Sequence, residues 1–377
     1  MSVMVRFLHT ADWQIGMTRY YLEGEAQSRF SQARIDVIRR IGSLAAEERC
    51  RFVLVCGDVF ESNQVERDIV IRALEAMAET PQIPFYLLPG NHDPLDASTV
   101  YRSPTFNDKR PPNVVVLNGL APVEAAPGVE LIAAPWPSKD PRADLTNRAC
   151  DGLGATDGIR IVVGHGQVDR FAHSHHHPAR VELEVLEGKL EAGLIHYVAL
   201  GDRHSKTEAG STGRVWYSGA PEPTNFRETD PGHVLVVSLG RDWVDVEGRL
   251  VAAWRFLSRE WEVVDDSDLD SIDEWLSGMR PKERTVIRTS VAGRVTLQQR
   301  ARLSDLIADH RDPMAFLGVD YQALVTSADA ADIEALGVSG FARKAVQDLG
   351  ELADEGDNAQ VARDALVLLQ RLIGENR

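Results

Sequence analysis

Hydrophobic residues in the first 240 positions come in short runs rich in β-branched side chains, separated by amphipathic stretches. Apolar positions at helical spacing predict helices over Gln27–Glu47 and over Arg67–Glu79, the second ending before Pro81. This alternation predicts an α/β domain in which helices cover the faces of a sheet. Six runs have the length and composition of buried strands: Arg6–Thr10, Phe52–Cys56, Phe85–Leu88, Val114–Leu117, Ile159–Val163 and Tyr197–Leu200.

The pattern changes at about Asp245, where a βαβαβ unit long enough for a small separate domain begins. We therefore expect three segments, 1–240, 241–326 and 327–377. An apolar stripe in the last segment is either intrachain core or a docking surface, and both remain open. The predicted elements of the unit are Arg259–Val264, Ser267–Met279, Thr285–Ala292, Thr296–His310 and Ala315–Val325. The stripe consists of Val361, Ala365, Leu368, Leu369 and Leu372.

Composition narrows the class of protein. The chain has 377 residues, 44% of them hydrophobic and 26% charged, which is typical of globular domains. No apolar run approaches the roughly 20 residues of a membrane span, so we expect no membrane association. The N-terminus turns polar after Leu8, which argues against a signal peptide. Three cysteines without paired spacing favour the reducing cytoplasm.

The formal net charge is −16, whereas proteins that bind nucleic acid usually present a basic face. Part of the excess lies after Val325, where ten acidic residues stand against five basic ones. Carboxylates that bind metal ions would account for another part. Charge therefore neither supports nor excludes DNA as a ligand, but it argues against purely electrostatic binding.

Polar residues of the kinds that bind metals follow five of the predicted strands. In open α/β sheets, ligands collect at the carboxyl ends of strands, and a preceding glycine allows the sharp turn that this requires. Each motif alone is more often a turn or a loop, but five of them in this order indicate a shared metal site for manganese, iron or zinc. The motifs are Asp12-Trp13-Gln14, Gly57-Asp58-Val59-Phe60-Glu61, Gly90-Asn91-His92-Asp93, Gly164-His165-Gly166 and Gly201-Asp202-Arg203-His204.

The order of these motifs resembles that of the calcineurin-like metallophosphoesterase superfamily. Within it, His9–Trp13, Gly57–Phe60 and Tyr217–Pro223 resemble the SbcD-like nucleases of DNA double-strand-break repair. The resemblance implies a metallophosphoesterase α/β sandwich, followed by a small α/β capping domain that orients DNA and by a helical tail. It also implies two divalent metal ions, with manganese expected.

The resemblance implies a role for each matching residue. Asp58 would bridge the two metals, Asp12 and His204 would bind the first, and Asn91 and His165 would bind the second. His92 would be the catalytic histidine beside the scissile phosphate, acting as a general acid.

Two positions depart from the family pattern. Gln14 stands where a histidine usually binds the first metal, and Asp202 stands where a histidine usually binds the second. A carboxylate can still bind a cation, whereas an amide oxygen is a weaker ligand. The alternative, a degraded and inactive site, is weakened because the other ligand types are present.

The remaining residues near these motifs have two interpretations each. Arg203 is a candidate phosphate contact. Asp93 either orients the ring of His92 or belongs to a turn. Trp13 and Phe60 more often pack beneath a site than touch substrate, and the histidine-rich segment His173–His177 is more often a surface loop than a source of ligands.

We therefore expect a two-metal DNA exonuclease or endonuclease that works with an SbcC-like coiled-coil ATPase, and a homodimer stays open. One alternative is a phosphodiesterase for small nucleotides, against which the capping domain and the tail argue. The other is a non-catalytic DNA-binding subunit, which Gln14 and Asp202 motivate.

Overall fold

The computed structural model describes residues 3–171, 180–327 and 340–354, together with 361, 362, 365, 366, 368 and 369. It divides into two compact units, Met1–Trp254 and Arg255–Arg377. Within the described segments, none of the helices combines the length and the hydropathy that a membrane crossing requires.

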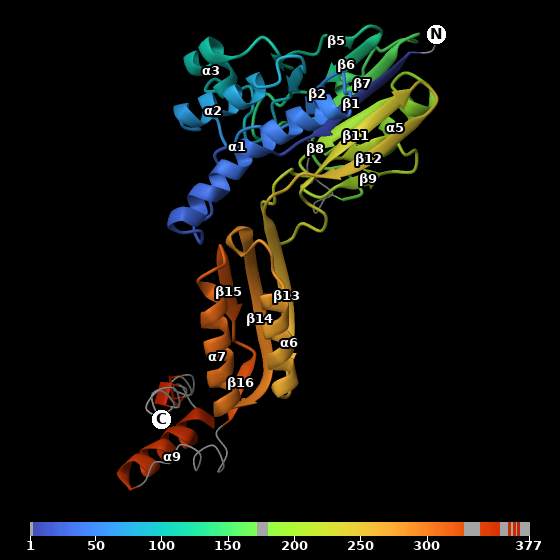
Figure 1. Cartoon of the computed structure of the whole chain (residues 1–377). Coiled ribbons are helices and arrows are strands. Elements are labelled where there is room, and N and C mark those ends of the chain that lie inside the picture. Colours follow the sequence, from blue (N-terminus) through green and yellow to red (C-terminus); the bar gives the residue numbers. More distant parts are fainter. Residues whose placement is uncertain are drawn as a thin grey trace. The chain divides into compact units, whose positions relative to one another are not determined.

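The first unit contains two six-stranded sheets among its described residues (Figure 1). In the first sheet, β1 to β4 are parallel, and β11 and β12 extend it antiparallel beyond β1. Its order is β12-β11-β1-β2-β3-β4. The strands are β1 (Met4–Thr10), β2 (Val53–Val55), β3 (Phe85–Leu87), β4 (Val114–Val116), β11 (His233–Gly240) and β12 (Val244–Leu250).

In the second sheet, β6, β7, β8 and β10 are parallel, and antiparallel strands close both edges. Its order is β5-β6-β7-β8-β10-β9. The strands are β5 (Val123–Ala126), β6 (Val129–Ala133), β7 (Ile159–His165), β8 (Tyr197–Gly201), β9 (Thr207–Ala209) and β10 (Val215–Tyr217).

The two sheets pack face to face through the apolar side chains that alternate along their strands. Phe7 and Leu54 of the first sheet share one buried cluster with Leu131, Ile161 and Tyr197 of the second. Helices cover the outer faces (Figure 1). The helical segments are α1 (Gly24–Glu47), α2 (Arg67–Ala78), the 3-10 turn η1 (Val100–Arg102), α3 (Pro104–Lys109), α4 (Leu145–Ala149) and α5 (Leu183–Glu191).

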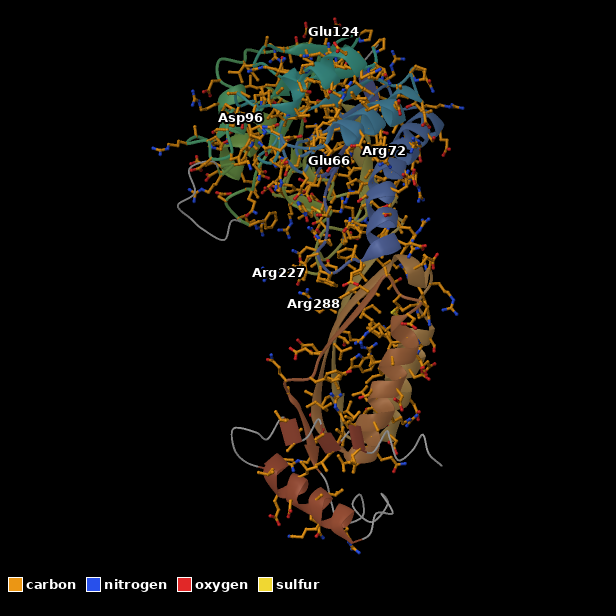
Figure 2. All side chains as sticks on the ribbon, turned by 90° about the vertical axis from the view of Figure 1, so that its left-hand side faces the viewer. Glu66, Arg72, Asp96, Glu124, Arg227 and Arg288 are labelled. Carbon is orange, nitrogen blue, oxygen red and sulfur yellow. The ribbon has the colours of Figure 1, made fainter. Side chains whose placement is uncertain are left out.

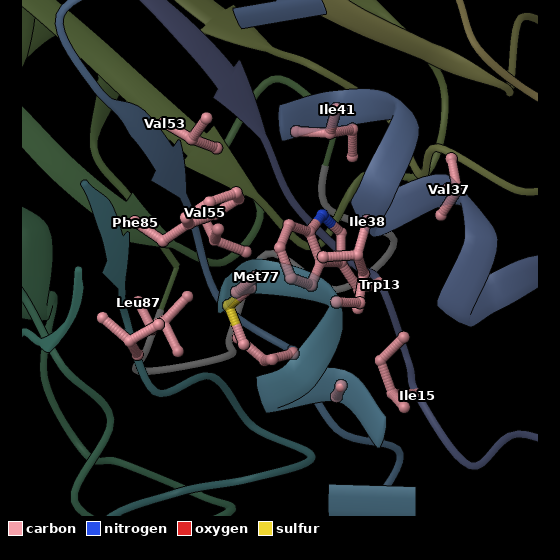
Figure 3. Close-up of a cluster of buried hydrophobic side chains, with 14 of the residues drawn as sticks. Trp13, Ile15, Val37, Ile38, Ile41, Val53, Val55, Met77, Phe85 and Leu87 are labelled. Carbon is pink, nitrogen blue, oxygen red and sulfur yellow. The ribbon is translucent and has the colours of Figure 1, made fainter. Parts of the chain in front are cut away.

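The core between the helices and the first sheet is apolar (Figure 3). Ile38 and Ile41 of α1 lie over Val53 and Val55 of β2 and are fully buried. Burying such a side chain stabilises the fold by about 1.5–3 kcal/mol. This packing fixes the strands whose ends carry the polar motifs, so the motifs lie on a rigid base.

The first unit ends later than the sequence pattern indicated. We expected a boundary at residue 240, but β12 pairs with β11 over seven residues, Val244 to Leu250. Beyond β12, Val251 and Trp254 are buried, and the Trp254 ring packs edge-on against Phe30. The alternation of β12 is weak because it is an edge strand with half-exposed residues, so its sequence resembles a loop.

The second unit has the expected βαβαβ order, with one correction. The predicted strand Ala315–Val325 is two strands, β15 and β16, which a turn after Asp320 separates and which pair successively with β14. Helices α6 and α7 cover one face of this sheet. The elements are β13 (Arg255–Val263), α6 (Asp266–Ser277), the 3-10 turn η2 (Lys282–Arg284), β14 (Thr285–Thr296), α7 (Leu297–Arg311), β15 (Phe316–Asp320), β16 (Leu324–Ser327) and α9 (Phe341–Asp354).

The helical tail, expected as the separate segment 327–377, packs on this second unit. Leu297 shares one buried cluster with Val346 of α9, Ala362 and Leu366. Val361 and Leu368 of the predicted stripe are 68% and 56% exposed. The buried face of the tail includes Ala362 and Leu366, and of the predicted stripe Leu369 packs against it. Leu372 lies outside the described residues.

Candidate metal centre

Both sheets deliver polar side chains to one centre at the carboxyl ends of their parallel strands. Three of the side chains, those of Asp12, Asp58 and His165, are buried and bring ligand atoms within 4.8 Å of one another. The first sheet supplies Asp12, Gln14, Asp58, Asn91 and His92, which follow β1, β2 and β3. The second supplies His165 at the end of β7, and Asp202 and His204 after β8.

The backbone around the centre is tightly interlocked. The N–H of Asp12 donates to Gly57 O at 3.1 Å, and the N–H of Gln14 donates to Asp58 O at 2.9 Å. Gly57 has a φ of +95°, and a Cβ on it would lie 2.1 Å from His165 Nδ1. A side chain at this position would therefore displace a ligand, which explains the glycine before Asp58.

Four of the centre's non-glycine residues adopt left-handed backbone conformations. The φ angles are 54° at Asp12, 45° at Gln14, 54° at Asp58 and 90° at Asp202. Such angles are uncommon outside glycine and cluster at functional sites. Each turns the chain sharply enough to point its side chain inward.

Asp58 lies between two histidines. Its Oδ1 accepts a hydrogen bond from the N–H of His92 at 2.9 Å, and its Oδ2 lies 3.5 Å from His165 Nε2 and 3.9 Å from His92 Nε2. Burial opposes ionisation of Asp58, but the charge and hydrogen bonding of His165 outweigh burial and lower the pKa of this carboxyl. Asp58 is therefore a buried carboxylate that stays ionised.

The ring of His165 is oriented by the backbone. Its Nδ1 donates to Cys56 O at 2.8 Å, so Nε2 faces the centre. There Nε2 lies 2.7 Å from Asn91 Oδ1 and 3.9 Å from Asp202 Oδ1. The structure thus brings together all the residues that the resemblance assigned to the second metal, together with the substituted Asp202.

His204 is oriented by two residues that the sequence analysis missed. Its Nδ1 lies 2.7 Å from Thr224 Oγ1 and 3.0 Å from Glu228 Oε1, so its Nε2 faces Asp12 Oδ1 at 3.9 Å and Gln14 Nε2 at 3.4 Å. A carboxylate behind a histidine is the arrangement that fixes a metal-binding imidazole. Nothing in the local sequence marks Glu228, because its partner lies 24 positions away.

His92 is the most accessible histidine of the three. Its side chain is 36% exposed, and its Nδ1 donates to Glu61 O at 2.9 Å, which leaves Nε2 directed toward Asp58. Asp93 has no part in orienting this ring. Its carboxylate accepts from the N–H of Gly90 at 2.8 Å, from Phe60 N at 3.0 Å and from Tyr101 OH at 2.6 Å. Of the two interpretations, Asp93 is the turn residue that holds the loop.

The centre attracts positive charge. Burial raises the pKa of Asp12 to about 7. Burial lowers the pKa of His204, but the hydrogen bond to Glu228 and the charge of Asp12 outweigh it and raise that pKa to about 9. The pKa of His165 is raised as well, since the charges of Asp58, Asp12 and Asp202 outweigh its burial. Without bound cations, protons on these side chains offset the negative charge of the carboxylates. Bound cations would neutralise the same charge.

The donor set fits divalent cations. Carboxylate oxygens and imidazole nitrogens suit manganese, iron and zinc. Gln14 Oε1 is buried and, among the described residues, has no hydrogen-bond partner. Buried amide oxygens are rarely left in this state, so Gln14 Oε1 is available as a weak ligand. Asp202 adds a carboxylate where the family has an imidazole.

The other predicted residues of the site stack on aromatic rings or are buried in the core. Arg203 lies over the Phe171 ring at 4.5 Å, and its Nε donates to Thr207 Oγ1 at 2.9 Å. Trp13 and Phe60 are fully buried in the core, which agrees with the interpretation that they pack beneath the site. His173–His177 lie outside the described residues.

Arg34 is a second feature that sequence reasoning missed. It is 1% exposed, and its guanidinium donates to Trp13 O at 3.0 Å and to Pro223 O at 2.8 Å. It thereby ties the loop of Asp12 and Gln14 to the loop that orients His204. Burial lowers the pKa of Arg34 to about 10, so it remains charged at neutral pH.

The chain belongs to the calcineurin-like phosphoesterase family, whose sequence model matches residues 5–206, more than half of the chain. This family is one of metal-dependent hydrolases of phosphoesters, which confirms the resemblance and the fold class expected from the sequence. The matched residues contain every predicted ligand from Asp12 to His204.

The chain is also similar in sequence to individual proteins. The SbcD component of the SbcCD nuclease of Bacillus subtilis is 30% identical over 95 residues, 24% of this chain and 23% of that protein. The DNA double-strand break repair protein Mre11 of Methanosarcina acetivorans is 23% identical over 264 residues, 67% of this chain and 40% of that protein. The chain thus spans less than half of each relative. A dimetal phosphatase from Danio rerio, with a TM-score of 0.38 and 12% identity, matches over 64% of this chain and 98% of its own.

Proposed function

We propose that this chain hydrolyses phosphodiester bonds in DNA and that the reaction uses two bound divalent cations. We propose manganese as the metal. One observation carries the proposal. His92, His165 and His204 each have Nδ1 bound by the protein, so that all three present Nε2 to the shared carboxylates of Asp12 and Asp58.

Each ligand has a proposed place. Asp58 lies between the histidines and would bridge the cations, with Asp12, His204 and Gln14 around the first. His165, Asn91 and Asp202 would surround the second. When bound, the cations would supply Lewis-acid activation of water and neutralise charge on the phosphate.

The chain's own residues would position the substrate and move the proton. His92, whose Nδ1 is held by Glu61 O, would donate from Nε2 to the leaving oxygen as a general acid. Arg203, held over Phe171, would contact a phosphate oxygen with its guanidinium.

DNA is proposed as the substrate because the two relatives are named as part of a nuclease and as a DNA double-strand break repair protein. We propose that the second unit orients the DNA. The exposed Val361 and Leu368 of the tail would dock on an SbcC-like coiled-coil ATPase, and the chain would pair as a homodimer.

The cysteines are buried and free, which fits the cytoplasm proposed as its location.

Two alternatives make different predictions. A phosphodiesterase for small nucleotides would hydrolyse cyclic nucleotides efficiently and ignore DNA. A non-catalytic DNA-binding subunit is favoured by Gln14, whose Nε2 lies 3.4 Å from His204 Nε2 and whose amide oxygen is only a weak ligand. Such a subunit would bind DNA without cleaving it at any manganese concentration.

Manganese-dependent cleavage of DNA by the full chain tests the proposal. Asp58→Asn should lose both bound manganese and cleavage, because it removes the central charge. His92→Ala should retain manganese and lose most turnover, since only the proton donor is removed. Glu124→Gln, at an exposed position of β5 (Figure 2), is the control and should match the unmodified protein. Cleavage at the unmodified rate by His92→Ala would refute its role.

A further inference from the structure

Two loops beside the metal centre carry aromatic rings that face one another. The rings of Tyr20 and Tyr21 meet edge to face with centroids 5.2 Å apart, and Tyr21 lies 6.1 Å from the ring of Phe226. We call these three residues the aromatic platform. Tyr20 is 91% exposed, more than the other large apolar or aromatic side chains described as exposed. A ring this open contributes little to folding, and it offers its own flat face to a planar ligand. The three rings are inclined to one another, by 81° between Tyr20 and Tyr21 and by 41° between Tyr21 and Phe226.

The platform is joined to the metal centre through hydrogen bonds. Phe226 lies between Thr224 and Glu228, the two residues that contact His204 Nδ1. Arg19, next to Tyr20, donates from Nε to Thr224 O at 3.0 Å. Two residues of chain span at most about 7 Å. Phe226 is therefore within a few nucleotides' length of the centre, at about 3.4 Å per stacked nucleotide.

Two arginines flank the platform and would contact a phosphate backbone, although the chain as a whole is acidic. Arg19 precedes Tyr20, and Arg227 is exposed beside Phe226 (Figure 2), whereas the exposed Glu23 and Glu25 follow Leu22. The acidic groups of the second loop have partners of their own. Glu222 accepts from the N–H groups of Ala253 and Trp254, and Glu228 pairs with His204.

We propose that the aromatic platform stacks an unpaired nucleobase of the DNA strand whose phosphate lies in the metal centre. This deepens the proposed function, on which it rests, and gives single-stranded or frayed DNA ends as the substrate class. Stacking on aromatic rings is tolerant of sequence, because every base has a flat face, and flanking arginines hold the backbone. A fully paired base would keep its face against its neighbours and leave the platform empty.

The test compares oligonucleotides that carry either a base or an abasic site near the scissile bond. With the unmodified chain, removing the base should raise KM by about 5- to 150-fold, the equivalent of ~1–3 kcal/mol per stacked base. Tyr20→Ala should raise KM for the intact strand similarly and should no longer distinguish the abasic strand. Tyr20→Phe, which keeps the ring, should behave as the unmodified chain.

A binding measurement and a matched control complete the test. In the presence of a chelator, a fluorescent purine analogue in the strand should be quenched by the unmodified chain and not by Tyr20→Ala. Trp243→Ala removes an exposed ring at the turn between β11 and β12 and should change nothing. If the unmodified chain cleaves both strands equally, the platform is refuted while the nuclease function stands. If it cleaves no DNA at all, the proposed function fails first.

Discussion

Glu228→Gln is the sharpest single change that the centre offers. The Glu228 carboxylate lies 3.0 Å from His204 Nδ1 and accepts from the N–H of Thr224 with both oxygens, at 3.2 and 3.0 Å. Glutamine has nearly the same shape but only one accepting oxygen and no charge. His204 therefore keeps its position but loses the charged partner that holds its ring and its proton.

The size of the effect follows from these contacts. A hydrogen bond to a charged group contributes about 1.5–3 kcal/mol. Loss of a carboxylate behind a metal-binding histidine lowers metal affinity about 10- to 100-fold, which corresponds to ~1.4–2.7 kcal/mol. The two ranges agree. Above about pH 9, where His204 has lost its proton in both proteins, we expect manganese affinity to fall by this factor. Turnover at saturating manganese should change little, since Glu228 touches no reacting atom.

Calorimetric titration of manganese into the full chain measures the effect directly, and the manganese dependence of DNA cleavage gives a second value. Glu66→Gln removes the same charge from an exposed position before α2 (Figure 2) and is the control. An affinity within about twofold of the unmodified chain, in a folded variant, would refute the orienting role of Glu228.

Three further outcomes follow. Gln14→His should lower the manganese concentration for half-maximal cleavage, because imidazole is a stronger ligand than an amide; an unchanged titration would place position 14 outside the coordination shell. Manganese affinity should rise from about pH 6 to about pH 9, because His204, whose pKa is raised to about 9, must lose its proton to bind a cation; titrations across that range would show it, and a flat profile would contradict it. Asp93→Asn should destabilise the fold by about 1–3 kcal/mol in urea unfolding, because its one NH₂ group would face the N–H of either Gly90 or Phe60, which now donate to different oxygens of the carboxylate; an unchanged midpoint would count against the loop-holding role.

The sequence was most informative at the ends of the strands. There a ligand type, a glycine and a buried run coincide within a few residues, so Asp58 and His165 could be predicted to lie at one centre, where the structure has them 3.5 Å apart. Their role as metal ligands stays a prediction. The apolar runs of β1, β2, β3, β7 and β8 were equally clear, since both faces of these strands are buried.

What the sequence could not show depends on contacts between distant segments. Glu228 and Arg34 act on the centre only after folding, and each resembles an ordinary surface residue of its own segment. The edge strand β12 lacks a clear alternation of buried and exposed residues. The domain boundary predicted at residue 240 therefore falls before the observed end of the first unit. In the tail, the predicted apolar stripe included Val361, which is exposed, whereas its neighbour Ala362 is buried.

The left-handed backbone of Asp12, Gln14, Asp58 and Asp202 has a consequence for heat resistance. Such a conformation costs about 1–2 kcal/mol for each non-glycine residue, less where an aspartate side chain bonds locally. Crowded like charges in the same loops add to this cost in the metal-free protein. A cation at about 100 times its dissociation constant would return ~2.7 kcal/mol to the folded state. If the centre binds cations as proposed, the temperature at which this chain unfolds should rise with the free cation concentration, and a chelator should lower it.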